Sequence, residues 1–229
     1  MGTITKATTR TWLLLAIAIA AVGVAGAADR VVLCEELTNV YCHSCGYAAG
    51  AFDRLVDVYP DSFALVQIHV NDAYATAWGD DRWLFYDAQA TPTAVFDGTD
   101  RVAGAVDDVD QQYTIYRTNH FLPRRAAEAE VTLDLSAEDI GNGEYRITAE
   151  AALEPGAAAR DVRVWIVQVL DHFPADRTVH RNTFKRAAPP EDARLEPSTP
   201  VTVTRTLTFD ADSWKIGRAS CRERVCHRV

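Results

Sequence analysis

The 229-residue sequence lacks the motifs of several large enzyme and binding classes. It has no glycine-rich phosphate-binding loop, no Ser–His–Asp signature and no basic patch interleaved with aromatic residues. Its 32 acidic residues outnumber its 23 lysines and arginines, and the formal net charge is −9. Because an acidic surface repels phosphate groups, this composition argues against nucleic acids and anionic membranes as partners.

No apolar run in the sequence is long enough to cross a bilayer comfortably, which takes about 20 residues. The longest run, Trp12 to Val24, follows the positive charges of Lys6 and Arg10 and precedes the small residues Ala25-Gly26-Ala27. We therefore predict that residues 1–27 are an export signal and that the mature protein is periplasmic or otherwise extracytoplasmic, where disulfides persist. An uncleaved signal is the alternative, and it is the only membrane contact that we expect.

The last fifteen residues stand apart from the rest of the chain. Residues 215–225, translated back into DNA, match a common sequencing adaptor in one reading frame. We therefore expect residues 215–229 to be non-native and the natural sequence to be interrupted near Trp214. Cys221 and Cys226 are accordingly not counted as a disulfide pair. A genuine basic tail is the alternative.

Only three cysteines remain once this tail is set aside: Cys34, Cys42 and Cys45. The last two form a Cys-x-x-Cys motif that follows an apolar segment and stands where a helix should begin. There the first sulfur meets the positive end of the helix dipole, which stabilises a thiolate and lowers its pKa. The second sulfur, one turn away, can resolve a mixed disulfide. The motif therefore predicts dithiol–disulfide chemistry.

Neighbouring residues favour the same chemistry. A protonated His43 would further favour the thiolate, and Ser44 can donate a hydrogen bond to sulfur. About fifty residues after Cys42, the segment Thr91-Pro92-Thr93 precedes a second apolar run. A permanently oxidised structural disulfide is the alternative interpretation of the motif.

These residues resemble the thioredoxin superfamily over roughly residues 30–109. The resemblance implies an α/β fold in which a central mixed sheet is flanked by helices. It implies a strand before the dithiol, a helix over 48–59, a second strand over 63–70, and a third segment over 92–98. In that family the third segment opens on a cis proline that faces the sulfurs. The two residues between the cysteines are not the family's familiar Gly-Pro pair, so the resemblance does not carry a redox potential.

The resemblance also implies catalytic roles. Cys42 would be the nucleophile and Cys45 the resolving cysteine, and the two would form the redox-active disulfide. The family's buried acid, which moves protons to and from the resolving sulfur, maps to Glu36. Its neighbour Glu35 competes for this role, because strand alternation alone does not decide which side chain points inward.

Three residues are expected to contact the substrate. Pro92 would contribute the cis peptide bond that aligns a substrate chain beside the sulfurs, and Thr91 would offer backbone hydrogen bonds to that chain. His43, between the cysteines, completes this set. A simple loop proline is the alternative for Pro92, because most X–Pro bonds are trans.

The pattern changes after residue 109. Residues 110–122 are typical of an amphipathic helix, which Pro123 is expected to end. Strand-like segments then follow, separated by turns rich in Gly, Pro and Asn, and residues 189–200 are expected to form a long charged loop. The predicted strands cover 131–135, 145–149, 162–170 and 201–209, of which 162–170 is the most continuously apolar.

These segments predict a small all-β, sandwich-like domain over 124–214, possibly truncated, after the thioredoxin-like domain over 28–123. This order resembles the twenty-eight-kilodalton outer-membrane-protein-related family of bacterial envelopes. The likeness is carried by three stretches of sequence: Glu35-Glu36-Leu37-Thr38, Ile68-His69-Val70-Asn71, and Val164-Trp165-Ile166-Val167-Gln168-Val169 followed by His180-Arg181.

Two functions follow from these observations. The first is an extracytoplasmic thiol–disulfide oxidoreductase that needs no cofactor and acts on cysteine-containing envelope proteins or on a redox partner. The second is a non-catalytic envelope binding module, for a protein partner or for copper or zinc held by Cys42, Cys45 and either His43 or His69. Apart from these roles, His69 is expected to be a semi-buried structural histidine and Cys34 a buried, inert thiol.

Overall fold

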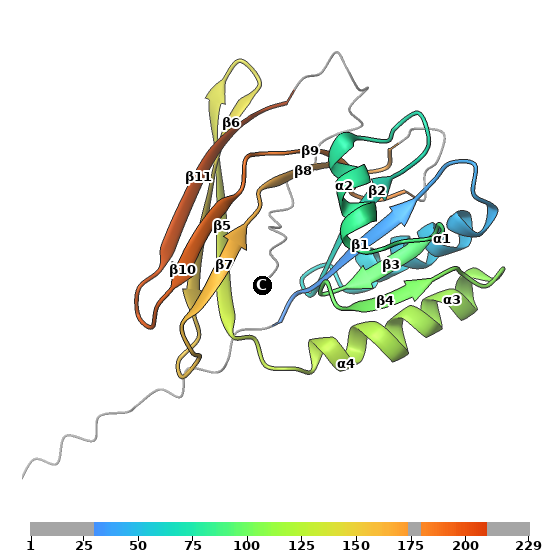
Figure 1. Ribbon diagram of the computed structural model, residues 1–229, viewed down its shortest axis with the longest axis horizontal. Helices are drawn as coiled ribbons and strands as arrows, with labels where there is room; N and C mark the ends of the chain where they lie inside the picture. The colour runs from blue at the N-terminus through green and yellow to red at the C-terminus, as the bar shows by residue number, and fades with distance from the viewer. Residues whose placement is uncertain (1–29, 174–179, 210–229) are drawn as a thin grey trace, which may run out of the picture.

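The computed structural model describes residues 30–173 and 180–209. The predicted export signal (1–27) and the predicted non-native tail (215–229) lie outside the described residues. The described chain is mixed α/β: a mixed central sheet with helices on both faces, and a further β region beside it (Figure 1). Within the described ranges, no helix combines the length and the apolar character needed to span a membrane.

The central sheet has six strands in the order β4–β3–β1–β2–β9–β8. β1 lies parallel to β2 and antiparallel to β3, and every residue of β1 and β2 is buried. Such continuous burial is typical of strands covered on both faces. The strands are β1 (Val32–Thr38), β2 (Phe63–His69), β3 (Thr93–Phe96), β4 (Asp100–Ala103), β8 (Val167–Leu170) and β9 (Thr183–Ala187).

One face of this sheet is covered by two helical segments. The first is α1 (His43–Val58), and the second runs through α3 (Val109–Ile115), the π-helical turn η1 (Tyr116–Phe121) and α4 (Leu122–Arg125). An aromatic core fills the space beneath them, where the rings of Phe52 and Tyr116 stack with centroids 4.4 Å apart. This packing holds α1 against the central strands β1, β2 and β3.

The opposite face is covered by α2 (Ala77–Phe85). Its Trp78 and Trp83 pack on apolar side chains of β1 and β2, and the Trp78 ring stacks on Phe184 of β9 with centroids 4.1 Å apart. The strand β9 therefore joins the core of the first part of the chain.

The second helical segment continues through Pro123 to Arg125, so the prediction that this proline ends the helix is wrong. Proline lacks a backbone N–H, and it is tolerated in the first turn of a helix, where that group has no intrahelical partner. Pro123 occupies such a position, because it lies in the first turn of α4 directly after η1. The interrupted hydrogen-bond pattern of the π-helical turn accommodates the residue.

The further β region consists of a three-stranded antiparallel sheet, in the order β11–β6–β5, and a two-stranded sheet of β7 and β10. The β5–β6 hairpin turns at Gly141-Asn142-Gly143, the predicted turn, and all three residues have the positive φ that Gly and Asn tolerate. The two sheets share a separate apolar core. The strands are β5 (Val131–Gly141), β6 (Glu144–Leu153), β7 (Arg160–Val164), β10 (Glu191–Leu195) and β11 (Val201–Thr208).

Two sequence-based predictions in this region are wrong. Residues 162–170 are not one strand, because β7 ends at Val164 and β8 begins at Val167 in a different sheet. Residues 189–200 are not all loop, because β10 pairs antiparallel with β7. Arg163 bonds Asp192 across this pair, at 2.5 and 2.7 Å. The charged residues that suggest a solvent-exposed loop in the sequence therefore stabilise the pairing of two strands.

The predicted domain boundary at 123/124 does not separate the sheets, since β8 and β9 extend the central sheet. Arg181, just before β9, reinforces this junction. Its guanidinium bonds Asp171 at 2.6 Å and Asp53 and Asp57 of α1 at 2.9 Å each. These charge-assisted hydrogen bonds raise the pKa of Arg181, against the desolvation that opposes them, and hold the guanidinium charged.

We expect Arg181→Met to lower the free energy of unfolding by about 2 kcal/mol, because it removes hydrogen bonds to three carboxylates at a partly buried site. The matched control is Arg194→Met, which removes a more exposed arginine paired with Asp161 and Glu196. For the control we expect a change within about 0.5 kcal/mol. Urea denaturation measures both, and equal losses would contradict the assignment of Arg181 as a junction residue.

Candidate active site around the Cys42–Cys45 disulfide

Cys42 and Cys45 form a disulfide at the start of α1. Cys42 is the N-cap residue, and its Sγ accepts a hydrogen bond from the Cys45 backbone N–H at 3.2 Å. The helix therefore begins at His43, where the motif predicts it, and earlier than residue 48, where the helix implied by the resemblance starts. Cys45 is buried, whereas Cys42 is half-buried, so an incoming thiol reaches Cys42 more easily. The same Cys45 N–H would also stabilise a Cys42 thiolate.

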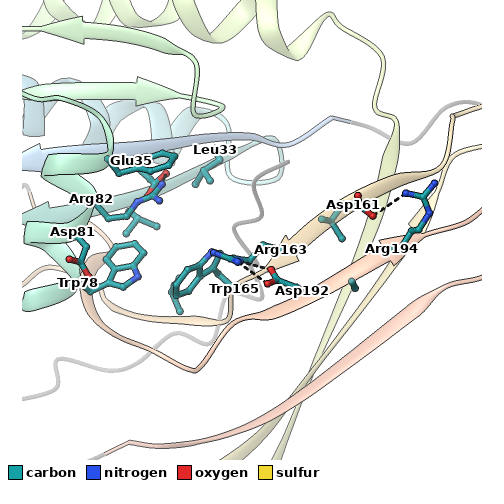
Figure 2. A pocket seen from close by; sticks show the side chains of 15 residues that line it. Leu33, Glu35, Trp78, Asp81, Arg82, Asp161, Arg163, Trp165, Asp192 and Arg194 are labelled. Carbon is teal, nitrogen blue, oxygen red and sulfur yellow. Dashed lines mark hydrogen bonds and ion pairs between the residues drawn. The ribbon is translucent and has the colours of Figure 1, made fainter.

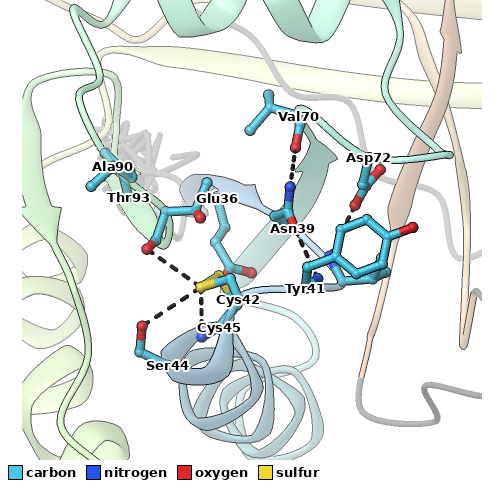
Figure 3. The surroundings of a disulfide bond; sticks show 12 residues. Glu36, Asn39, Tyr41, Cys42, Ser44, Cys45, Val70, Asp72, Ala90 and Thr93 are labelled. Carbon is cyan, nitrogen blue, oxygen red and sulfur yellow. Dashed lines mark hydrogen bonds between the residues drawn. A yellow bond between two sulfur atoms is a disulfide. The ribbon is translucent and has the colours of Figure 1, made fainter.

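The Thr91–Pro92 peptide bond is cis and lies beside this disulfide. The carbonyl oxygen of Thr91 is 3.4 Å from the Sγ of Cys42, and the Ser44 hydroxyl lies 3.6 Å from the same sulfur (Figure 3). The structure thus brings together segments that are about fifty residues apart in sequence. Their roles in binding a substrate remain predictions.

Glu36 is the carboxylic acid that points toward the sulfurs (Figure 3). Its side chain is fully buried, and burial raises the pKa of Glu36 from its ordinary value of 4.5 to about 8. Gln67 donates a hydrogen bond from Nε2 to Glu36 Oε2 at 2.6 Å, and Glu36 Oε1 has no hydrogen-bond partner among the described residues. A buried carboxyl that is protonated near neutral pH can deliver a proton to a leaving thiolate.

Glu35 points to the opposite face of the sheet and does not take part in this site. Arg82 of α2 bonds both of its carboxylate oxygens, at 2.7 and 2.6 Å, and the Tyr86 hydroxyl donates to it as well. Glu35 is therefore part of an ion pair that fastens α2 to β1. The alternation of side chains along the strand, combined with the observed pairing, resolves the choice that the sequence left open between the two acids.

The remaining predicted residues have distinct environments. His43 is exposed in the first turn of α1, where its ring meets Tyr47 edge-on with centroids 5.4 Å apart. Cys34 is a fully buried free thiol whose pKa is raised well above its ordinary value, mainly by desolvation. This environment suits the expected inert thiol, because the reactive thiolate is disfavoured.

His69 is more deeply buried than the sequence suggested. Its side chain is inaccessible to solvent, its Nδ1 lies 2.6 Å from Asp72 Oδ2, and its ring stacks on that of His180 with centroids 5.3 Å apart. Asp72 also accepts hydrogen bonds from the backbone N–H groups of Val40 and Tyr74, at 3.0 and 2.8 Å. These bonds connect the end of β2 to the loop that carries the disulfide.

Sequence reasoning missed two residues near the site. Gln67 holds Glu36, and its own Oε1 accepts a hydrogen bond from the backbone N–H of Arg181 at 2.5 Å, which fixes the orientation of the amide. His180 lines a groove beside the disulfide. A polar Gln inside the apolar run of β2 was a visible signal, but nothing local to His180 indicates its position in space.

A second cavity lies on the other face of the sheet, between α2 and the β7–β10 pair (Figure 2). It encloses about 1000 Å³ and is lined by aromatic side chains, including Trp78, Phe85 and Trp165, while Asp161, Arg163, Asp192 and Arg194 pair with one another along one wall. Phe85 is 56% exposed. We call this cavity the aromatic cleft.

Comparison with known proteins yields structural similarities only. No protein-family model matches the chain, and no curated protein matches it. A crystal structure of a protein from Agrobacterium tumefaciens is similar over 80% of this chain and 80% of its own, with 21% identity and a TM-score of 0.49. HBP35 of Porphyromonas gingivalis is similar over 80% of this chain and 66% of its own, with 14% identity and a TM-score of 0.58. The second similarity concerns the fold alone.

Proposed function

We propose that this protein is an extracytoplasmic thiol–disulfide oxidoreductase with a thioredoxin-like fold followed by a β-sandwich-like region. Its substrates are cysteine-containing envelope proteins or a redox partner. The observation that carries the proposal is the constellation around the sulfurs: an N-capping, accessible Cys42, a buried Cys45, the cis Thr91–Pro92 bond and the buried acid Glu36. Each component has a defined task in disulfide exchange.

The first step is attack of a client thiolate on Cys42 Sγ, which forms a mixed disulfide and breaks the Cys42–Cys45 bond. Cys45 leaves as a thiolate and takes a proton from the buried carboxyl of Glu36. The client's second thiolate then attacks the client sulfur of the mixed disulfide, and Cys42 leaves as a thiolate held by the Cys45 N–H. The client dithiol is oxidised to a disulfide, and the disulfide of this protein is reduced to a dithiol.

The same steps run in reverse when the reduced protein meets a client disulfide. A partner thiol–disulfide protein restores the starting state in either direction. Which direction dominates depends on the reduction potential of the Cys42–Cys45 couple against its surroundings. Equilibration with glutathione buffers measures that potential and assigns the protein as an oxidant or a reductant.

The test of the proposed function is catalysis of disulfide exchange by the purified protein. We expect it either to accelerate the reduction of insulin disulfides by dithiothreitol or to oxidise a peptide dithiol stoichiometrically. A protein that does neither, with a disulfide that resists mild reductant, would instead contain a structural disulfide.

Binding without chemistry is the second candidate function, and the aromatic cleft is the observation that favours it. Exposed aromatic side chains in a large cleft are typical of sites that bind protein partners. The soft-metal form of this alternative has less support, because within residues 30–173 and 180–209 no group of three or more His, Cys, Asp or Glu side chains is arranged to hold a metal ion.

If the cleft binds unfolded clients, we expect Phe85→Ser to weaken binding of cysteine-blocked, unfolded α-lactalbumin about tenfold, which corresponds to about 1.4 kcal/mol. The blocked cysteines exclude disulfide exchange, so fluorescence anisotropy measures binding alone. The matched control is Leu84→Ser, which removes an exposed apolar residue that does not line the cleft. Equal effects of the two variants, or no binding by the unaltered protein, would remove this candidate.

A further inference from the structure

A small groove of about 280 Å³ opens beside the disulfide. Both cysteines line it, together with backbone and side chains from the loop before α1 and from the first turn of that helix. His180 forms one wall of the groove and comes from a distant part of the chain, because it lies just before β9 in the second half of the sequence. Figure 3 shows the loop side of this region, with Asn39 and Tyr41 beside the sulfurs.

His180 is held in a defined place. It is 3% exposed, and its ring lies nearly parallel to that of His69, at an interplanar angle of 23°. The neighbouring Arg181 is fixed by its three carboxylate partners and by its backbone bond to Gln67. An imidazole at the wall of the groove is therefore positioned by the junction between the central sheet and the segment before β9.

A carboxylate stands behind this pair of rings. Asp72 and His69 both have fully buried side chains and share a hydrogen bond of 2.6 Å through His69 Nδ1. His69 Nε2 has no hydrogen-bond partner among the described residues. Asp72 bonds His69, His69 stacks on His180, and His180 lines the groove. The negative charge of Asp72 therefore stabilises a positive charge gained by the histidines.

The other titratable groups around His180 are identified by their elements. Tyr41, His43 and the two cysteines line the groove from the loop and from α1, and Tyr74 meets the His69 ring edge-on at 5.4 Å. Arg181, on the adjacent residue, is neutralised by Asp53, Asp57 and Asp171. No carboxylate lines the groove in the described part of the chain, and Asp72, through its bond to His69, is the acid that supports the histidine pair.

We propose that the groove receives the cysteine of a protein client and that His180 is the general base that removes the proton from the incoming thiol. This inference rests on the proposed function and adds a residue and a binding surface to it. The thiolate is the nucleophile in disulfide exchange, and an ordinary cysteine, with a pKa near 8.5, is mostly protonated at neutral pH. A base beside the disulfide therefore increases the fraction of productive encounters.

The client S–H bond breaks, its proton moves to the imidazole of His180, and the client sulfur forms a bond with Cys42 Sγ as the Cys42–Cys45 bond breaks. Cys45 takes up the electron pair and a proton from Glu36. His180 releases its proton to solvent after the exchange, and no further oxidant enters the step.

The test is the pH dependence of peptide-dithiol oxidation by the His180→Gln variant. At pH 6.5 we expect the second-order rate constant to fall about tenfold, which is less than the loss typical when a general base is removed. At pH 9.5 we expect no difference from the unaltered protein, because the client is then already a thiolate. The matched control is His172→Gln, which changes a histidine with a 55% exposed side chain outside the groove and should leave both rates unchanged.

The outcomes separate this inference from the proposed function. If the unaltered protein performs no exchange, the proposed function fails. If it does, and His180→Gln matches it at every pH or slows it equally at every pH, the base role of His180 is wrong. A second measurement needs no variant: near pH 7 the unaltered protein should react with alkyl thiols faster than their thiolate concentration and the nucleophilicity of that thiolate predict, with the uncatalysed reaction of the same thiols with oxidised glutathione as the reference. Rates that follow these two properties alone would overturn the inference.

Discussion

Replacing Cys42 by serine should abolish thiol–disulfide exchange, with a loss of more than about 1000-fold in the rate of peptide-dithiol oxidation or insulin reduction. A serine hydroxyl neither forms a mixed disulfide nor ionises near neutral pH. The fold should persist, because Cys42 is half-buried and serine is itself a good N-cap residue for α1. Stopped-flow kinetics measure the rate, and circular dichroism checks the fold.

The matched control is Cys45→Ser, which should behave differently. Cys42 would still attack a client disulfide, but the mixed disulfide would persist because the buried resolving thiol is missing. We therefore expect Cys45→Ser to capture clients as covalent adducts that non-reducing electrophoresis and mass spectrometry detect. Full exchange activity in Cys42→Ser, or adducts through Cys45 in that variant, would contradict the assignment of the nucleophile.

Replacing Glu36 by glutamine should slow thiol–disulfide exchange and, at pH 8, increase the free energy of unfolding. Near pH 7 we expect exchange to slow about 100-fold, the lower end of typical general acid–base effects, because glutamine cannot deliver a proton to Cys45. The rate constant of the unaltered protein, divided by the fraction of client thiol that is ionised, should fall as the pH rises through the pKa of Glu36, near 8, where the carboxyl loses its proton. The Glu36→Gln profile should lack this fall.

The stability effect has the opposite sign. Because burial raises the pKa of Glu36 from 4.5 to about 8, the folded state retains a proton that the unfolded state releases between those values. The free energy of unfolding is therefore highest below about pH 4.5. It decreases by about 1.4 kcal/mol for each pH unit above that, and the total loss near pH 8 is about 4 kcal/mol. Glu36→Gln should not show this fall, and denaturation at pH 5 and pH 8 measures it.

Glu35→Gln is the control for loss of a carboxylate from the same strand. It breaks the ion pair with Arg82 on the opposite face, so stability should decrease while the exchange rate and its pH profile stay unchanged. Parallel behaviour of the two variants would mean that Glu36 has no special relation to the sulfurs.

The predictions that hold are those fixed by local chemistry. The Cys-x-x-Cys motif places Cys42 at a helix start because its sulfur can accept the unpaired N–H of Cys45, which is a local interaction. The Gly141-Asn142-Gly143 turn and the alternation in β11 likewise depend on neighbours in sequence. The cis Pro92 was expected only through the resemblance to thioredoxins.

Two of the failed predictions, for residues 162–170 and 189–200, concern partners distant in sequence. An apolar run over 162–170 does not reveal that the chain leaves one sheet at Val164 and enters another at Val167. The prediction that Pro123 ends a helix rests on the low intrinsic helix preference of proline. It does not take account of the π-helical turn that precedes Pro123.

By itself, the sequence determined the two sulfurs, their order along a helix and the acidic character of the chain, because these follow from residue identity and short-range spacing. Only the tertiary structure decided between Glu35 and Glu36, since the sheet assigns each side chain to one face: Glu35 pairs with Arg82, whereas Glu36 lies buried on the other face, where its pKa is raised. It also brought His180 beside the disulfide through the pairing of β9 with β2. Strand pairing links residues over any distance in sequence, and no local pattern encodes which strands will meet.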